Sequence, residues 1–495
     1  MTRQPVRTVI APRAARGRGF TAATALMLAT LALAGCAIAP PPAQVAAPAP
    51  TQWFAPLPHN GAVADLRQWW SQWNDPLLAE LVDAAQAANP TVATAAARVG
   101  QARAARAQAA AALLPTLDAT ANASRGPMQT GGVPPMLATS GQAGLQASWE
   151  ADLFGGARAT RDAAQARLEG ADAAWHEARV SVAAEVATAY FAQRACARQL
   201  DVALGDAKSR AETARLSDES AKAGFTAPAS AALARASAAE GAGRATQRRA
   251  QCDIGIKSLV ALTALDEPAL RARLAGARPA TAQAAFFDIE RIPARALAQR
   301  PDLYRAEREV AAASAETGSA QAARYPRLSL GGFVGRSAYR ASGSTFSFDT
   351  WTLGPLALSV PLFDGGRSVA NVDAARARHD EALANYTGLV RQAVREVEEA
   401  LVNLDSTRAR STDAQTAADG YRASFVATEA RFRNGLASLV ELEDARRTML
   451  AADTTLIDLQ REREAAWVAL YRASGGGWQR PADGDENAAA PLATR

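Results

Sequence analysis

The sequence predicts a mainly α-helical chain that also supplies four β-strands to a membrane sheet. Three observations carry this prediction: a helix–strand–strand–helix pattern occurs twice, four segments alternate apolar and polar residues, and two long stretches contain no proline. Four strands cannot close a barrel, and lipid does not tolerate an open sheet edge. Three copies would supply twelve strands, an even number within the range of outer-membrane barrels, so we expect a trimeric twelve-stranded membrane barrel continued by a hollow cylinder of long helices.

The repeat emerges when the second half of the chain is laid on the first with an offset of 211 positions. Pro90 and Pro301 differ by this offset, and so do Gly224 and Gly435. Other landmarks recur in the same order: Leu114-Pro115 with Tyr325-Pro326, Glu185-Val186 with Glu396-Val397, and Leu153-Phe154-Gly155-Gly156 with Leu362-Phe363-Asp364-Gly365-Gly366.

Helices and strands within each copy follow from the spacing of apolar residues. An alanine-rich helix follows Pro90 and Pro301 and ends at the next proline. The period then becomes two over a pair of strands, after which a long stretch lacks proline. Its alanine content favours a ring of closely packed helices, although an ordinary coiled-coil bundle is the alternative. We expect short helices at 91–113 and 302–324, strands at 117–123, 143–153, 328–334 and 356–362, helices of about 100 Å at 156–222 and 366–433, and returning helices at 229–262 and 437–472.

The N-terminus predicts export and a lipid anchor. Five arginines and no acid precede a short apolar stretch, which ends at Leu33-Ala34-Gly35-Cys36. We expect Cys36 to be lipidated, and the alternative is an ordinary secretory cleavage site that happens to precede a cysteine. Ala37 in place of aspartate points to the outer membrane. We divide the chain into a signal peptide at 1–35, an anchor with a proline-rich linker at 36–60, repeats at 61–262 and 301–472, a connector at 263–300 and a flexible tail at 473–495.

The charge of the mature chain argues against a nucleic-acid partner. The full sequence has a formal net charge of +5, and the predicted signal peptide carries five of its arginines, so the mature chain is neutral. A nucleic-acid-binding surface needs an excess of positive charge. We expect no such partner.

Two further cysteines, Cys196 and Cys252, each lie 28 positions from Gly224. If the helices pair around a turn at this glycine, the two thiols sit at equal height. They could form a disulfide in an oxidising compartment, or remain two buried thiols on different faces.

Catalysis is not indicated. The three histidines, His59, His176 and His379, have no metal-ligand partner at a suitable spacing, and we expect the last two to be exposed polar residues on the long helices. Motifs for phosphate binding or for a nucleophilic serine are absent. We expect neither an enzyme nor a cofactor or metal site.

Five motifs, in order and spacing, resemble the TolC-like outer membrane efflux protein family, specifically the lipidated, NodT-type branch that serves resistance-nodulation-division pumps. The resemblance covers about residues 60 to 472. The motifs are Trp69-Trp70 with Trp73-Asn74-Asp75-Pro76-Leu77, then Ser148-Trp149-Glu150-Ala151-Asp152-Leu153-Phe154-Gly155, Ala189-Tyr190-Phe191, Gln299-Arg300-Pro301-Asp302-Leu303, and Val360-Pro361-Leu362-Phe363-Asp364-Gly365-Gly366.

The resemblance implies a passive homotrimeric duct for drugs or other small toxic compounds, driven by an inner-membrane pump. The duct would consist of a twelve-stranded β-barrel in the outer membrane and a long periplasmic α-helical barrel. It implies that a periplasmic adaptor docks on the hairpin ends, and that residues 61–88, 263–300 and 473 onward form a collar. The docking residues would be Gly224, Phe225 and Thr226 in the first copy and Gly435, Leu436 and Ala437 in the second.

In the family, charged contacts near these ends hold the tunnel shut. The gate candidates here have helical spacing, although such charges are also typical of a solvated helix face. A leucine usual in the family is replaced by Glu443, beside Glu441 and Asp444. The gate candidates are Arg215, Asp218, Lys222, Glu429 and Arg433.

Other membrane machines are the alternatives. A channel for metal-ion efflux or for type I protein secretion belongs to the same family. A periplasmic adaptor would have one hairpin and all-β domains, and a helical scaffold lipoprotein would lack alternating strands, so both fit the doubled pattern less well.

Overall fold

The structure is a computed structural model that describes residues 40–44, 49–50, 53–55, 69–73, 75–128, 136–276, 297–341 and 343–480. The predicted signal peptide, Cys36, residues 129–135 and most of the 263–300 connector lie outside these residues. The chain forms two compact units. The first holds the described residues up to Pro42 with Gln108–Ala163 and Ala313–His379, and the second holds the remaining described residues.

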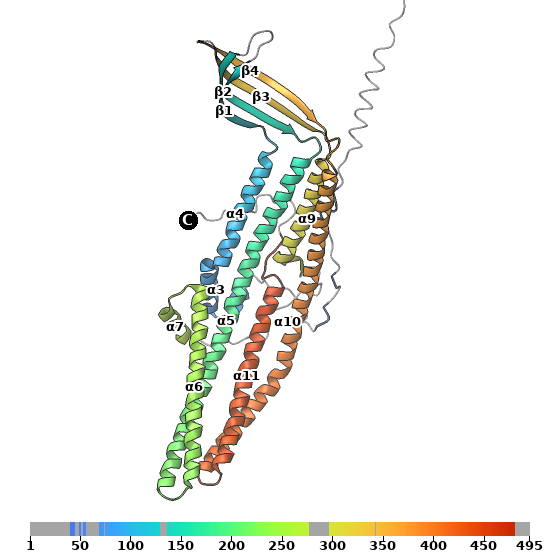
Figure 1. Cartoon of the computed structure of the whole chain (residues 1–495). Helices are drawn as coiled ribbons and strands as arrows, with labels where there is room; N and C mark the ends of the chain where they lie inside the picture. Colours follow the sequence, from blue (N-terminus) through green and yellow to red (C-terminus); the bar gives the residue numbers. More distant parts are fainter. Residues whose placement is uncertain are drawn as a thin grey trace, which may run out of the picture. The chain divides into compact units, whose positions relative to one another are not determined.

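The first unit contains an antiparallel sheet of four strands in the order β1-β2-β3-β4 (Figure 1). All four strands are longer than the alternation predicted. The prediction failed at their far ends, where serine, threonine, glycine and arginine interrupt the period. The strands are β1 (Thr116–Met128), β2 (Met136–Ala151), β3 (Arg327–Ala341) and β4 (Ser344–Ser359).

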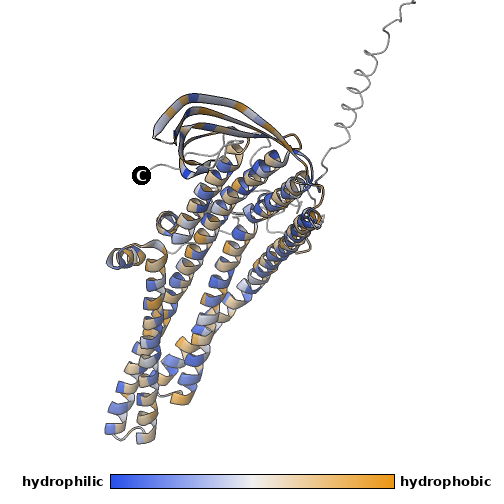
Figure 2. Cartoon of the chain, turned by 45° about the horizontal axis from the view of Figure 1, so that its top comes forward, coloured by the Kyte–Doolittle hydropathy of each residue, from blue (hydrophilic) through white to orange (hydrophobic). Residues whose placement is uncertain are grey.

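The register places most of the large apolar side chains on one face of this sheet. Leu145 of β2 lies opposite Val334 of β3, which in turn lies opposite Trp351 of β4. Hydrophobic and hydrophilic residues alternate along the strands in Figure 2. The apolar side chains are open to solvent in a single chain, with Trp351 76% and Leu353 80% exposed. Within the described residues, β1 pairs only with β2 and β4 only with β3, so both outer edges are open.

Pro355 lies inside β4, although a proline inside a strand removes a backbone donor and usually weakens the strand. The strand continues through it, and the register with β3 shifts between Leu330 and Gly332. β4 ends at Ser359, so Val360 and Leu362 fall outside the strand, contrary to the prediction.

Two short helices and two helical hairpins follow the predicted plan. The first hairpin pairs a 67-residue helix with a 36-residue helix, and the second pairs a 67-residue helix with a 35-residue helix (Figure 1). No helix within the described residues carries an apolar run long enough to cross a membrane. The elements are α4 (Pro90–Ala111), α9 (Pro301–Ala322), α5 (Gly156–Lys222), α6 (Pro228–Thr263), α10 (Arg367–Arg433) and α11 (Leu439–Ala473).

The main core lies in the second unit, where three smaller helices pack around the hairpins. Asp75 caps the first turn of one of them, and its other carboxylate oxygen accepts a hydrogen bond of 2.5 Å from the Tyr190 hydroxyl. Trp73 packs against Phe191 with ring centroids 4.6 Å apart. Two of the motifs quoted above therefore meet in the core. The smaller helices are α2 (Trp69–Gln72), α3 (Pro76–Ala88) and α7 (Glu267–Gly276).

The described parts of the proline-rich linker pack on the helices. In the first unit, Ser314 donates a hydrogen bond of 2.5 Å to the Pro41 carbonyl, and His379 is buried beside the Pro42 carbonyl. In the second unit, both carboxylate oxygens of Glu398 accept hydrogen bonds from consecutive backbone N–H groups of the linker, those of Phe54 and Ala55. The expectation that His379 is exposed was therefore wrong, because the linker covers it.

The predicted flexible tail was wrong for its first residues, and residues 481–495 lie outside the described part of the chain. α11 ends at Ala473, and Gly475, Gly476 and Gly477 then reverse the chain with positive φ angles. The Arg480 side chain returns to α9, where it forms an ion pair of 2.7 Å with Glu307.

Candidate functional site

The first hairpin end is built around a left-handed glycine. Gly224 has φ +81°, and the N–H of Phe225 donates to the Ser220 carbonyl at 2.9 Å, which closes the C-terminus of α5. Pro228 then begins α6 at a position where its missing N–H costs nothing. The Phe225 ring is 87% exposed. The turn therefore presents a large apolar side chain to solvent.

The second hairpin end repeats this design with a different cap. Gly435 has φ +72°, and the N–H of Leu436 donates to the Arg431 carbonyl at 2.8 Å. Ser438 and Glu441 cap α11 reciprocally. Leu436 is 69% exposed, so both ends carry an exposed apolar side chain directly after the glycine.

Two of the predicted gate residues of α5 pair within the first hairpin. Arg215 is bound to Glu212 and Glu219 of its own helix, both at 2.7 Å. Asp218 forms an ion pair of 2.5 Å with Arg235 of α6. The hydrogen bond and charge of Glu212 raise the pKa of the Arg215 guanidinium, although the group is fully exposed.

The predicted gate residues of α10 lie nearer the contact between the hairpins. Glu429 pairs with Arg433 at 3.3 Å and accepts a hydrogen bond from the Ser209 hydroxyl of α5. Among the described residues, no ion pair joins Arg215, Asp218 or Lys222 to Glu429 or Arg433. The structure therefore does not bring the two predicted sets together.

A set of three buried charges and one half-buried charge, which the sequence reasoning missed, does join the hairpins. This hairpin ion network consists of Asp206 and Arg210 of α5 with Glu443 and Arg446 of α11. Arg210 lies 2.8 Å from Asp206 in its own helix and 2.5 Å from Glu443 across the contact. Arg446 forms an ion pair with Glu443 and lies 3.9 Å from Asp206. The four charges form a closed ring between the two hairpins.

Polar and aromatic groups from all four hairpin helices surround this network. Arg446 is fully buried, donates hydrogen bonds to the hydroxyl oxygens of Ser209 and Thr213, and lies 5.5 Å from the Phe425 ring centre. Burial lowers the pKa of the Arg446 guanidinium, while the Glu443 carboxylate opposes that shift. Ser237 of α6 accepts a hydrogen bond from Arg210. The only sequence signal for this site was the replacement of the usual leucine by Glu443.

Glu441 and Asp444, which flank Glu443 in the sequence, do not join it. Glu441 caps its own helix, and Asp444 pairs with Arg447 one turn on. The excess of acids seen in the sequence is therefore divided among three separate roles.

A disulfide lies farther along the first hairpin. Cys196 of α5 and Cys252 of α6 are bonded, with Sγ atoms 2.00 Å and Cα atoms 5.6 Å apart. The bond joins the two helices at equal sequence distance from Gly224. Of the two alternatives that the sequence left open, a disulfide or two buried thiols, the structure has the disulfide.

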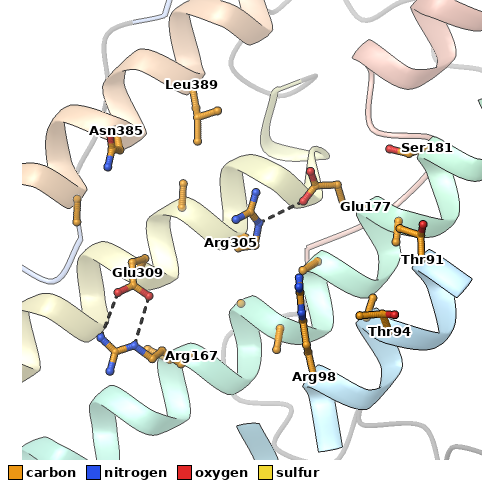
Figure 3. A pocket seen from close by; sticks show the side chains of 18 of the residues that line it. Thr91, Thr94, Arg98, Arg167, Glu177, Ser181, Arg305, Glu309, Asn385 and Leu389 are labelled. Atoms are coloured by element: carbon orange, nitrogen blue, oxygen red, sulfur yellow. Dashed lines mark hydrogen bonds and ion pairs between the residues drawn. The ribbon is translucent and has the colours of Figure 1, made fainter. Parts of the chain in front are cut away.

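A hollow of about 1140 Å³ lies in the second unit between α4, α5, α9 and α10. Its walls carry ion pairs between α5 and α9, Arg167 with Glu309 at 3.1 Å and Glu177 with Arg305 at 3.2 Å (Figure 3). Arg98 of α4 lines the same hollow. Within the described residues, no cluster of histidine, cysteine, aspartate and glutamate side chains could hold a metal ion.

Known proteins resemble the chain over nearly its whole length. The family model described as outer membrane efflux protein matches residues 81–265 and again residues 292–476. The outer membrane protein OprJ of Pseudomonas aeruginosa is 33% identical over 470 residues, which cover 91% of this chain and 95% of OprJ. The probable outer membrane lipoprotein SilC of Salmonella typhimurium is 27% identical over 463 residues, 90% of this chain and 96% of SilC.

The fold is also that of a solved channel. The structure of the outer-membrane channel OprN superposes with a TM-score of 0.80 at 29% identity, covering 90% of this chain and 100% of OprN. The two matches to the family model are themselves offset by 211 positions, which agrees with the internal repeat.

Proposed function

The chain belongs to the outer membrane efflux protein family, and on that premise we propose that three copies form a passive duct of a tripartite efflux system. The duct would carry drugs or other small toxic compounds from the periplasm and an inner-membrane pump to the outside. The observation that carries the trimer is the four-stranded sheet with an exposed apolar face and two open edges. Such edges are stable in lipid only when another strand pairs with them.

We place the adaptor contact at the hairpin ends. Phe225 and Leu436 are exposed apolar side chains at the two turns, and a trimer would present six such turns. Exposed apolar groups on a charged surface are typical of protein contacts. Helical hairpins of a periplasmic adaptor would pack against them end to end.

The hairpin ion network would hold the periplasmic end closed. It joins the second hairpin to the first at a buried point, so the hairpins cannot separate without breaking its ion pairs. Breaking a buried pair leaves a charge without compensation, which costs several kcal/mol. Contact with the pump and the adaptor would supply that energy.

A lipid on Cys36 would anchor each copy in the outer membrane. The cleavage motif, the proline-rich linker and the similarity to a probable outer membrane lipoprotein support this anchor. Replacing Cys36 by serine should abolish incorporation of labelled palmitate. The controls, Cys196→Ser and Cys252→Ser, should leave the labelling unchanged. Labelling of the Cys36→Ser variant would contradict the anchor.

Gene deletion with complementation tests the function itself. We expect the deletion strain to become more susceptible to several chemically unrelated small compounds, and the intact gene to restore resistance. Metal salts and a secreted-protein assay are run in parallel, because sensitivity to metals alone, or loss of one secreted protein, would favour those alternatives. A strain that tolerates every compound as before would argue against efflux.

A further inference from the structure

We propose that Arg98 of one copy forms an ion pair with Glu381 of the next copy, joining neighbouring subunits of the duct. The inference rests on the trimer of the proposed function and adds which residues hold two copies together. Its occupant is therefore a second copy of this chain.

The internal repeat supplies the template for this contact. α4 and α9 each have 22 residues, α5 and α10 each have 67, and the members of each pair begin 211 positions apart. Within one chain, α9 packs on α5. In a closed ring of three copies, α4 of the next copy would take the equivalent place beside α10. The contacts between α5 and α9 therefore indicate which residues meet between copies.

Two contacts within the chain define the geometry. Arg167 of α5 and Glu309 of α9 form an ion pair of 3.1 Å, facing each other in Figure 3. One turn farther along α5, Gly170 lies against α9 so closely that a Cβ atom on it would be 3.6 Å from the Cβ of Arg308. The helices are thus nearly in backbone contact at this level.

Adding or subtracting 211 positions gives the equivalent residues at the contact between copies, and there the positive and negative side chains are exchanged between the two helices. Glu309 corresponds to Arg98, Gly170 corresponds to Glu381, and Arg308 corresponds to Ala97. The acid thus moves from the α9-type helix to the α5-type helix, and the base moves the opposite way. Ala97 is small, so the Glu381 side chain has room to extend past it to Arg98, the next residue.

Both residues are available for this contact in a single chain. Arg98 and Glu381 are exposed, and neither takes part in an ion pair among the described residues. Arg378, one turn before Glu381 and equivalent to Arg167, is also exposed and has no ion pair within the part of the chain that the structure describes. Without Glu381, the contact between copies would bring Arg378 and Arg98 together as like charges. Glu381 compensates both.

A cysteine pair tests the register of the contact in the full-length protein. Ala97→Cys with Glu381→Cys places two thiols where the equivalent Cβ atoms are 3.6 Å apart, a separation typical of disulfides. We expect covalent species of two and three chains on non-reducing gels. The control pair, Arg103→Cys with Glu381→Cys, should remain single chains, because Arg103 lies six residues beyond Ala97 and is therefore rotated by about 120° around α4. Cross-linking of the first pair no greater than that of the control would overturn the register.

A charge exchange then tests the ion pair. Arg98→Glu and Glu381→Arg should each raise the trimer dissociation constant about tenfold, and the double variant should return to within about threefold of the wild type. If the dissociation constant of the double variant rises by the product of the two single increases, the two residues do not interact and the pair is refuted. Dissociation is measured by analytical ultracentrifugation in detergent. A wild type that is monomeric there would overturn the proposed trimer itself, whereas a trimeric wild type without coupling refutes only this inference.

Discussion

Glu443 of α11 lies 2.5 Å from the guanidinium of Arg210 in α5, so one half-buried carboxylate ties the second hairpin to the first. The same carboxylate also pairs with Arg446 of its own helix, which is fully buried. A cation in that position is stable only while an acid compensates it. Glu443 therefore compensates one cation on each hairpin.

Replacing Glu443 by leucine should open the periplasmic end. Arg446 would keep only the more distant Asp206, and the loss should cost about 3 to 5 kcal/mol of hairpin packing. We expect a several-fold higher conductance of the isolated channel in planar bilayers. The matched control is Glu399→Leu, which removes an exposed ion pair with Arg395 and should leave conductance unchanged. Equal conductance of the wild type and the Glu443→Leu variant would exclude a gating role for the network.

The disulfide should stabilise the first hairpin alone. Cys196 and Cys252 are 56 positions apart. Closing a loop of this size lowers the entropy of the unfolded chain, which raises the free energy of unfolding by about 4 kcal/mol at most. The double variant Cys196→Ser/Cys252→Ser should therefore unfold at a lower temperature than the wild type in calorimetry. Reductant should lower the wild-type transition and not that of the variant. Mass spectrometry showing two free thiols in the non-reduced wild type would contradict the bond.

Glu464 should make stability depend on pH between about 4.5 and 7. Burial raises the pKa of this carboxyl to about 7, against the opposing charge of Arg198. The folded state therefore holds a proton that the unfolded state releases above pH 4.5, so stability falls as pH rises and levels off above 7. The loss should approach about 3 kcal/mol.

Glu464→Gln should remove that dependence. The variant should match the wild type near pH 4.5 and be the more stable protein at pH 8, as measured by denaturant unfolding at both pH values. An unchanged pH dependence in the variant would show that another group is responsible.

Gly475→Ala should be far more disruptive than Gly224→Ala. Both glycines have positive φ angles, +86° and +81°. A Cβ at 475 would lie 2.1 Å from the Gln299 carbonyl oxygen, whereas a Cβ at 224 meets open space. We expect the Gly224→Ala variant to lose about 1 kcal/mol and the Gly475→Ala variant to accumulate poorly in the membrane. Comparable yields and melting temperatures of the two variants would count against a tight C-terminal turn.

Local patterns were enough to predict the repeat and the helices. Proline and glycine end these helices, and their spacing alone places the turns at Gly224 and Gly435. The strands were underestimated because alternation fades near Arg125 and Arg340, where residues on both faces are polar.

Which charged side chains are buried could not be predicted from the sequence. Arg446 and Arg210 have the spacing of an ordinary solvated helix face, and only the neighbouring helices decide that they are covered. The same holds for His379, which is buried by a linker far away in the sequence. The tail was misjudged because three consecutive glycines indicate flexibility, while here their positive φ angles allow a reversal against Gln299.

The equal length of α5 and α10 limits how this protein can evolve. Inserting one residue into either helix would lengthen it by 1.5 Å and turn everything beyond by 100°. The altered hairpin would then present different side chains at its end than its twin does. Insertions and deletions in one 67-residue helix should therefore survive among descendants only when the other helix acquires a matching change, so that the two halves of the gene change length together.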